Sequence, residues 1–299
     1  AVNLLRFARR HGLPAPAQNA RDGLARHAPA ILSRLEYFGE HDTGNHLSNN
    51  GRGLFILGLE LAMPDYADLG ARILIEEARR IFLPSGALRE GSSHYHFLLT
   101  RNYAEAWLAA RRHGHASAGA MKTIAARALA VIPHLTLTGG MPLVGDISPD
   151  CPPAHLAALL PNDPATAGWG ALLDAEDRAA FLDLKSSVAA CEPGALAADG
   201  WLKFESGDWS GLWHLDPGGF APMPGHGHQD AGSFDIHWRG ALLFIDLGRG
   251  VYGETGAAAL YRSALAHNGL ILDGADPYPP NKPYYDDGFR RREGGAPPE

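Results

Sequence analysis

The sequence predicts an α+β protein with two domains, a helical array over residues 1–192 and an antiparallel β-sheet domain over residues 193–299. Apolar residues recur at helical spacing in successive segments up to about residue 190. Near Gly194 this period gives way to the alternation of apolar and polar residues that is typical of strands. The chain has 299 residues, 45% of them hydrophobic, which is enough for about two domains with buried cores.

The helical domain is predicted from runs of apolar residues on one helix face. The first run places Leu24, Ile31 and Leu35 at helical spacing, and connections that contain Gly and Pro separate it from the runs that follow. The predicted helices are residues 20–38, 46–61, 66–82, 94–113, 118–132 and 164–189. This succession indicates antiparallel neighbours in a helical toroid or a solenoid, and no fixed-period repeat distinguishes the two.

Residues 139–153 interrupt the helical pattern, because they contain too much Gly and Pro for regular structure. A loop of this length in a compact domain is usually functional or disordered, and its apolar content favours an ordered one. The sheet domain then begins with a hairpin over residues 201–216, around a Ser-Gly-Asp turn. Strands over residues 233–238 and 241–246 follow, and the chain stays β-rich to Asp273.

Charge and cysteine content exclude several classes of protein. With 26 Lys and Arg against 33 Asp and Glu, the net charge of −7 provides no basic field for nucleic acid or for an anionic membrane. A polyanionic ligand would need a local cluster of Arg and His. Cys151 and Cys191 cannot make a disulfide scaffold and match no zinc-ribbon spacing, although one disulfide between them stays open.

Location in the cell is poorly constrained by the sequence. No apolar run reaches the roughly 20 residues that span a bilayer, and the first residues lack the apolar core of a signal peptide. Because the chain begins without Met and ends in a polar tail over residues 290–299, we interpret it as a fragment or a processed piece of a longer protein.

A candidate metal site lies in the sheet domain. His226 and His228 stand in a glycine-bracketed turn before a strand, Asp246 ends the next strand, and His267 follows. Imidazole, carboxylate and imidazole are a common ligand set for tetrahedral zinc. The alternative is that these are ordinary polar residues in turns and at strand ends, and the residue types alone leave both interpretations open.

Two predicted helix starts carry groups suited to an anionic ligand. Asn45 and His46 open one helix, and Tyr95 lies between His94 and His96 at the start of another. Free backbone amides and the helix dipole favour an anion at such positions. The alternatives are that Asn45 is a helix cap and that Tyr95 is a core residue with a polar tip.

Taken together, these segments resemble the heparinase II/III superfamily of polysaccharide lyases, which includes alginate and oligoalginate lyases. The shared motifs run in order from Gly44 to Asp273: Asn45-His46, Ser92-x-x-Tyr95-His96, His226-x-His228-x-Asp230, Asp246-x-Gly248, Tyr261-Arg-Ser263 and His267-Asn268. The resemblance implies an (α/α) toroid packed on an antiparallel β-sandwich, with the active cleft between them. Family members are commonly longer, which implies an incomplete toroid and a truncated sandwich here.

The resemblance also implies an activity, β-elimination on a uronic-acid-containing anionic glycan, in the periplasm or outside the cell. Tyr95 would be the catalytic acid and base with His46 as its partner, and Asn45 and His226 would hold the uronate carboxylate. The zinc ion would be structural, and its ligands would be His228, Asp246 and His267. Further candidates for substrate binding are Arg52, Arg89, Glu90, His96, Arg101 and Arg262.

The chemistry explains these residue types. Elimination removes the C5 proton of the uronate, which becomes acidic enough only when donors such as Asn45 and His226 stabilise the charge that develops on the carboxylate. Tyr95, with an ordinary pKa of about 10, must be brought toward ionisation by its neighbours. The local candidates are His46, His94, His96 and Arg89. After taking a proton, the same tyrosine can give it to the leaving glycosidic oxygen.

Two other functions stay open. A cupin-type metal enzyme would use a His-x-His pair with a later His, but the expected Glu after the pair is absent and the helical half is unexplained. A catalytically silent protein of the same fold, for glycan binding or for capsule or exopolysaccharide assembly, would keep every matching residue. An absorbance assay for unsaturated uronate separates a lyase from both.

Overall fold

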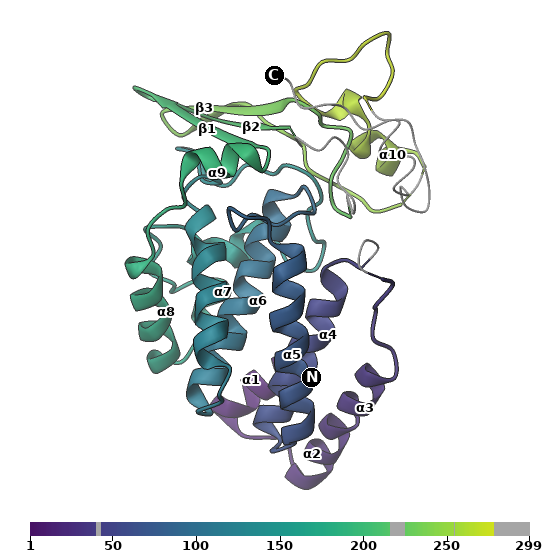
Figure 1. Ribbon diagram of the computed structural model, residues 1–299, viewed down its shortest axis with the longest axis vertical. Coiled ribbons are helices and arrows are strands. Elements are labelled where there is room, and N and C mark those ends of the chain that lie inside the picture. Colours follow the sequence, from purple (N-terminus) through teal and green to yellow (C-terminus); the bar gives the residue numbers. More distant parts are fainter. Residues whose placement is uncertain (40–42, 216–224, 254, 278–299) are drawn as a thin grey trace.

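The computed structural model describes residues 1–39, 43–215, 225–253 and 255–277. Figure 1 shows two layers, a group of helices packed side by side and a β-sheet that lies across one end of them. No helix in these ranges is both long enough and apolar enough to cross a membrane. The two layers correspond to the predicted helical and sheet parts of the chain.

Four long helices form the centre of the helical layer. They are α4 (Asn45–Glu60), α5 (Pro64–Ile81), α6 (Ser93–Arg112) and α7 (Ala118–Val131). Each lies within two residues of its predicted range, and α6 is buried along most of its length against its neighbours. Glycines let α4 and α5 approach closely, because a Cβ atom on Gly58 would lie 2.4 Å from the backbone nitrogen of Ala67.

The predicted helix over residues 20–38 is wrong in its extent. The structure has two shorter helices, α2 (Ala17–Ala25) and α3 (His27–Leu32). Pro29 has no N–H to bond to the preceding turn, so it is accommodated near the start of a new helix and not inside a continuous one.

The predicted helix over residues 164–189 is also too long, because α8 spans only Ala175–Ser187. Asp174 caps its start by accepting a hydrogen bond from the Asp177 backbone at 2.8 Å. Before this cap the chain turns at Gly168, whose φ of 53° is left-handed, and forms the short 3-10 helix η2 (Gly170–Leu172).

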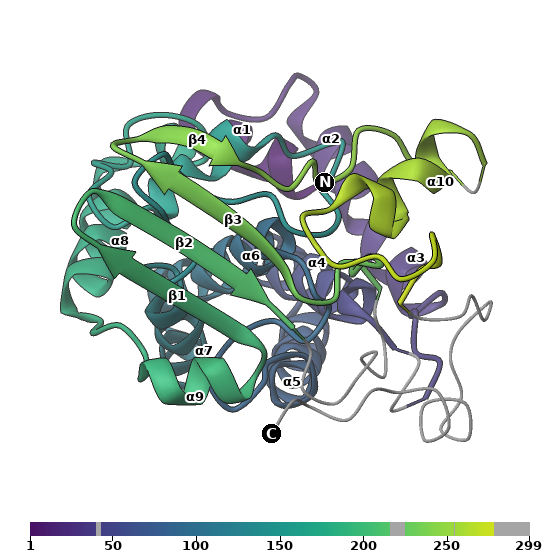
Figure 2. The same cartoon turned by 90° about the horizontal axis from the view of Figure 1, so that it is seen from above.

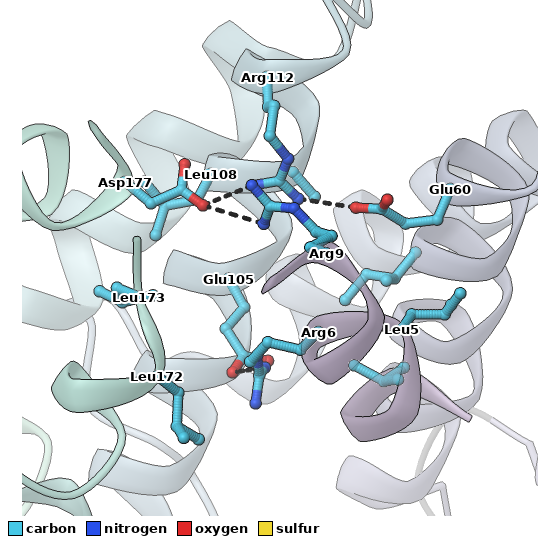
Figure 3. Close-up of a pocket in the computed structure, with 13 residues that line it drawn as sticks. Leu5, Arg6, Arg9, Glu60, Glu105, Leu108, Arg112, Leu172, Leu173 and Asp177 are labelled. Carbon is cyan, nitrogen blue, oxygen red and sulfur yellow. Dashed lines mark hydrogen bonds and ion pairs between the residues drawn. The ribbon is translucent and has the colours of Figure 1, made fainter. Parts of the chain in front are cut away.

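Helix α1 (Val2–His11) was not predicted and is held to the layer through charged side chains. Figure 3 shows Arg6 pointing at Glu105 of α6, and Arg112 of α6 lying between Asp177 and Glu60. Leu5 adds a buried apolar contact. Helix α1 therefore closes the helical layer on the side of Glu105.

The sheet has four antiparallel strands in the order β1-β2-β3-β4. The strands are β1 (Trp201–Ser206), β2 (Trp209–His214), β3 (Ser233–Trp238) and β4 (Ala241–Phe244). The predicted hairpin and strands are present, with the last strand ending at Phe244 and not at Asp246. The short helix α9 (Pro193–Ala198) precedes the sheet, and the predicted domain boundary at 192/193 falls directly before it.

The two faces of the sheet differ in burial. Trp201 and Leu212 are buried on the face toward the helices. The opposite face is apolar and open: its Trp209 and Trp238 side chains pair across the strands with ring centroids 6.1 Å apart, and Trp213 is 43% exposed. Figure 2 looks onto the sheet and shows the strands lying over the helices.

The Gly- and Pro-rich loop over residues 139–153 runs between the two layers and is ordered, as predicted. The backbone of Ser93, at the start of α6, bonds to the Val144 carbonyl at 3.1 Å, and the Asp146 backbone bonds to the His226 carbonyl at 2.8 Å. The loop thus connects the start of α6 to the turn that carries His226. Cys151 and Cys191 are both free thiols, so the disulfide that stayed open does not form.

Candidate active site

Asn45, the first residue of α4, lies at the junction of the two layers. Its backbone N–H and its Nδ2 donate to the two carboxylate oxygens of Glu90, at 2.7 and 2.8 Å. Its Nδ2 also lies 2.9 Å from Nε2 of His226, which comes from the sheet part of the chain. Glu90, expected among the substrate-binding residues, is fully buried and holds Asn45 in place.

Tyr95 completes this cluster from the first turn of α6. Ser92 caps the helix by accepting a hydrogen bond from the Tyr95 backbone at 3.0 Å. The phenol ring stacks on the His226 ring with centroids 3.4 Å apart and planes inclined by 15°. Its hydroxyl lies 3.2 Å from that of Tyr252. Asn45, Tyr95 and His226, distant in sequence, are therefore brought together.

The surroundings of Tyr95 raise its pKa, whereas neighbours that lower it were expected from the sequence. Burial raises the pKa of Tyr95, hydrogen bonds to Tyr252 and Ser148 partly offset this, and the negative charge of Asp146 raises it further. The expected cationic neighbours are not supplied by the adjacent histidines, because burial lowers the pKa of His94 and of His96 to about 4. Tyr95 therefore keeps its proton at neutral pH.

His46 does not lie beside Tyr95, where the resemblance placed it. Its side chain is 63% exposed, and its Nδ1 lies 2.9 Å from a carboxylate oxygen of Glu36. The imidazole in contact with Tyr95 is that of His226. We therefore assign the position next to the tyrosine to His226.

Asp146, in the loop between the layers, is a functional candidate that the sequence did not reveal. One of its oxygens lies 3.0 Å from Nδ1 of His226, the other 2.7 Å from Nε2 of His228, and Arg249 donates to it at 2.8 Å. Burial alone would raise the pKa of Asp146, but these hydrogen bonds hold it well below its usual range. The carboxylate is therefore ionised and can only accept hydrogen bonds.

This ionised carboxylate fixes where His226 carries a hydrogen. Because Asp146 only accepts, Nδ1 of His226 must carry a hydrogen. The other ring nitrogen, Nε2, faces the amide Nδ2 of Asn45, which is a donor. Asn45 can thus donate to Nε2, which also lies 3.5 Å from a carboxylate oxygen of Glu90.

The three predicted zinc ligands lie near one another on the sheet side. Nδ1 of His267 lies 2.7 Å from Oδ2 of Asp246, and the His228 and His267 rings have centroids 5.2 Å apart. With its Nε2 bonded to Asp146, His228 has a buried Nδ1 that finds no hydrogen-bond partner among the described residues. Within the same residues, no group of three or more His, Cys, Asp and Glu side chains is arranged to hold a metal ion.

The predicted substrate-binding residues fall in different places. Arg52, about two turns after Asn45 on α4, pairs with Glu105 of α6, and its Nε donates to a carboxylate oxygen at 2.9 Å. Arg89 donates to the Thr43 carbonyl at 2.7 Å. His96 lies in the helical core, with Nε2 3.0 Å from the Ala128 carbonyl, so its side chain has no surface for a ligand. Arg262 ends the short helix α10 (Ala257–Arg262) beside the His226 segment, where its carbonyl accepts from Gln229 at 3.0 Å.

Solved structures with the same fold include heparinases and heparan sulfate lyases. A structure described as the heparinase III BT4657 gene product has a TM-score of 0.61 at 19% identity, covering 84% of this chain and 40% of its own. A mutant of the heparan sulfate lyase HepC from Pedobacter heparinus has a TM-score of 0.60 at 18% identity, with the same two coverages. This chain thus spans about two fifths of the length of these structures. No curated protein sequence matches it.

The sequence itself carries a family match. Residues 192–293 match the family model of the heparinase II/III-like C-terminal domain. The match covers the sheet part of the chain, and the solved structures share its fold over 84% of its length. The matched region contains His226, His228, Asp246 and His267, whereas Asn45 and Tyr95 lie in the helical part before it. A cupin-type enzyme is set aside, because the fold shared with these structures accounts for the helical half that a cupin leaves unexplained.

Proposed function

We propose that the chain carries the catalytic groups of a polysaccharide lyase that cleaves a uronic-acid-containing anionic glycan by β-elimination. The observation that supports this best is the convergence of Asn45, Tyr95 and His226, from two helix starts and the sheet domain, in one bonded and stacked cluster. The cluster supplies an amide donor, a basic nitrogen and a phenol proton, which are the groups that elimination needs. The names of the structural relatives, heparinase and heparan sulfate lyase, point to the same class of reaction.

The first step concerns the substrate carboxylate. We expect it to accept a hydrogen bond from Nδ2 of Asn45, in place of Nε2 of His226. The exchange stabilises the negative charge that grows on the carboxylate as the C5 proton leaves. It also releases the lone pair of His226, whose Nδ1–H stays on Asp146, and Nε2 can then take that proton.

The second step concerns the leaving group. As the electron pair left at C5 forms the double bond to C4, the bond between C4 and the glycosidic oxygen breaks, and that oxygen takes the proton of Tyr95. The neutral phenol is already present, because its pKa is raised in the free protein. The phenolate of Tyr95 and the imidazolium of His226 then return to their starting states by proton exchange. Assignment of the base to His226 differs from the expectation that Tyr95 serves as both base and acid.

The experiment is an absorbance assay for the unsaturated uronate product with alginate, heparin, heparan sulfate, hyaluronan and bacterial capsular glycans. We expect product from at least one glycan, and a loss of at least about 10² in turnover for His226→Ala and for Asn45→Ala. Binding of these glycans without any product would favour the silent glycan-binding protein. Normal turnover in both variants would remove the cluster from the mechanism.

We also propose that His228, Asp246 and His267 hold a structural zinc ion, for which their side chains would have to move from the arrangement seen among the described residues into a ligand set. The proposal is supported by the donor set, the 5.2 Å separation of the two rings and the partnerless Nδ1 of His228 among the described residues. A bound ion would stabilise the turn that carries His226, and the elimination does not require it as a reactant. We expect about one zinc per chain by elemental analysis, lost in His228→Ala together with thermal stability. A metal-free protein with an unchanged melting temperature would contradict the proposal, and exposed His27→Ala is the control.

For the whole protein we propose that the helical layer is part of a toroid and that the sheet is one layer of a sandwich. The support is the open apolar face of the sheet, on which Trp209, Trp213 and Trp238 are exposed, since a large apolar patch usually marks a contact surface. In a longer form of the protein these tryptophans should be shielded from acrylamide quenching, whereas in this chain they should be accessible.

A further inference from the structure

A cavity of about 550 Å³ lies in the helical layer, away from the Tyr95 cluster. Three arginines line it, Arg6 from α1, Arg52 from α4 and Arg101 from α6, together with His11 and His155. Asp150 is the acidic side chain in its wall. The lining therefore carries an excess of positive charge.

These arginines share one buried carboxylate, that of Glu105. Arg6 and the Trp169 indole, at 2.6 Å, donate to Oε1, and both Nε and Nη2 of Arg52 donate to Oε2. Burial would raise the pKa of Glu105, but Arg52, Arg101 and Arg6 lower it to about 2, so the group is ionised. An ionised carboxylate has about four acceptor positions, and these four donors occupy them.

Arg101 is left without a full set of partners. Its Nη1 lies 3.7 Å from Glu105, beyond hydrogen-bond distance, and its buried Nε has no partner among the described residues. The side chain is only 13% exposed, and the part of it that Glu105 does not engage lines the cavity. A largely buried charged donor without an acceptor is costly, so an anion in the cavity would supply the partner that Arg101 lacks.

The cavity is connected to the candidate active site along α4. Arg52 follows Asn45 by about two helical turns, which places it on the same face of α4 about 10 Å away. Asn49 joins the two regions, because it donates to Asn45 at 3.1 Å and accepts from Asn102 at 2.8 Å. Hydrogen-bonded side chains therefore link Asn45 to α6 at Asn102, the residue next to Arg101.

We propose that this cavity is an anion-binding subsite that takes a carboxylate or sulfate group of the glycan, on a sugar beyond the one that is cleaved. The guanidinium of Arg101 matches either group in shape and charge. Asp150 opposes the same anion through its like charge. The identity of the glycan rests on the proposed function, whereas the anion site itself does not.

Calorimetric titration of the full chain with inorganic sulfate and, separately, with glucuronate tests the site at constant ionic strength. We expect Arg101→Gln to weaken binding at least about tenfold, because it removes the unpartnered guanidinium. Asp150→Asn should tighten it a few-fold, because it removes the opposing charge from an exposed position. The matched control is Arg111→Gln, on the outer side of the same helix, where the arginine pairs with Glu176 at 3.0 Å. The two ligands tell which anion the site prefers.

Equal affinities in wild type, Arg101→Gln and Asp150→Asn would overturn the subsite. If Arg101→Gln does not fold, the Asp150→Asn titration decides, since its side chain is exposed and its loss leaves the Glu105 cluster intact. With a cleaved glycan, Arg101→Gln should raise KM for long chains and leave kcat within about twofold. Anion binding with the expected pattern but no elimination product would contradict the lyase activity and support the subsite. Elimination product without the expected pattern of anion binding would contradict only the subsite.

Discussion

Tyr95 was expected to be brought toward ionisation, but in the structure its pKa is raised. Because it keeps its proton, Tyr95→Phe removes the acid while the ring can still stack on His226. We expect turnover to fall by about 10² or more with little change in melting temperature. Steady-state kinetics and thermal unfolding measure both. Tyr252→Phe breaks the same hydroxyl contact and leaves the acid in place, so an equal loss there would assign the role to the pair and not to Tyr95.

Asp146 is predicted to act through His226 and not on the substrate. Asp146→Asn keeps the shape but replaces an acceptor oxygen with a donor, so His226 no longer has its Nδ1–H fixed. Turnover should fall by about 10² or more, as expected when a catalytic histidine takes the wrong tautomer. Kinetics on the Asn variant test this, with Asp208→Asn, an exposed partner of Arg239 at 2.6 Å, as control.

The same variant should change the acid stability of the protein. The folded pKa of Asp146 lies below its unfolded value of about 3.9, so its contribution to the free energy of unfolding is present above about pH 4 and is lost as pH falls further. The Asp146→Asn variant should therefore lose less unfolding free energy than the wild type as the pH falls below about 4. Denaturant unfolding from pH 3 to pH 7 measures it, and an unchanged pH dependence would contradict the depressed pKa.

At the level of single residues, the sequence predicts the partners but not their geometry. Asn45, Tyr95 and His226 are identified because they stand in motifs with an order along the chain. Successive residues on a helix point about 100° apart, so when Asn45 faces the junction, His46 faces solvent. Asp146 stands in a Gly- and Pro-rich loop without any local pattern, and its role depends on three side chains that are close only in the fold.

Among the elements, length and amphipathic pattern decide what can be predicted. The helices α4 to α7 are long, so many apolar positions agree on one face, and their predicted limits are close to the observed ones. The predicted helix limits are wrong near Pro29, which lacks an N–H, and at Asp174, which caps the start of α8 although the apolar pattern begins earlier. Helix α1 is missed although Val2 and Leu5 stand at helical spacing, and its ion pairs, such as Arg6 with Glu105, join segments that are distant along the chain and could not be predicted from the sequence.

The buried histidines of helix α6 make the stability of the protein depend on pH. Burial lowers the pKa of His96 to about 4, below its unfolded value of about 6.5. The unfolded chain therefore binds a proton that the folded one does not, and stability is lost as pH falls from about 6.5 toward 4. Each such histidine contributes at most about 1.4 kcal/mol per pH unit.

His96→Gln should make this dependence shallower by about one proton, whatever its effect on stability at pH 7. The slope of the unfolding free energy between pH 4.5 and pH 6.5 is the measurement, since it separates titration from packing. His27→Gln, at an exposed position on α3, is the control and should keep the slope of the wild type. An unchanged slope in His96→Gln would show that His96 does not titrate in this range.

For the whole molecule, the candidate site depends on how closely the two layers approach. Asn45 and Tyr95 belong to the helical layer and His226 to the sheet part, so none of them can form the site alone. The approach is set by glycines: a Cβ atom on Gly91 would lie 3.1 Å from Cα of Gly227, next to His226. Neither the approach of the two layers nor the Gly91–Gly227 contact could be predicted from the sequence, because each involves two segments that are distant along the chain.

Gly145 provides the sharpest test of this spacing. Its φ of 74° is left-handed, and a Cβ atom there would lie 2.5 Å from the Gly91 carbonyl oxygen and 2.6 Å from that of His226. Gly145→Ala must therefore push the loop away from His226, and we expect turnover to fall at least about tenfold as the Asp146 contact lengthens.

The matched variant is Gly114→Ala, since Gly114 has a φ of 62° but nothing within 4 Å of the added atom. Both substitutions cost about 1 kcal/mol or more of backbone strain, which unfolding measurements report, but only Gly145→Ala adds a clash between the layers. A loss of turnover in folded Gly145→Ala protein that Gly114→Ala does not share would show that the separation of the layers controls the site. If both variants kept full activity, the site would tolerate a wider gap than the hydrogen bonds of Asp146 allow.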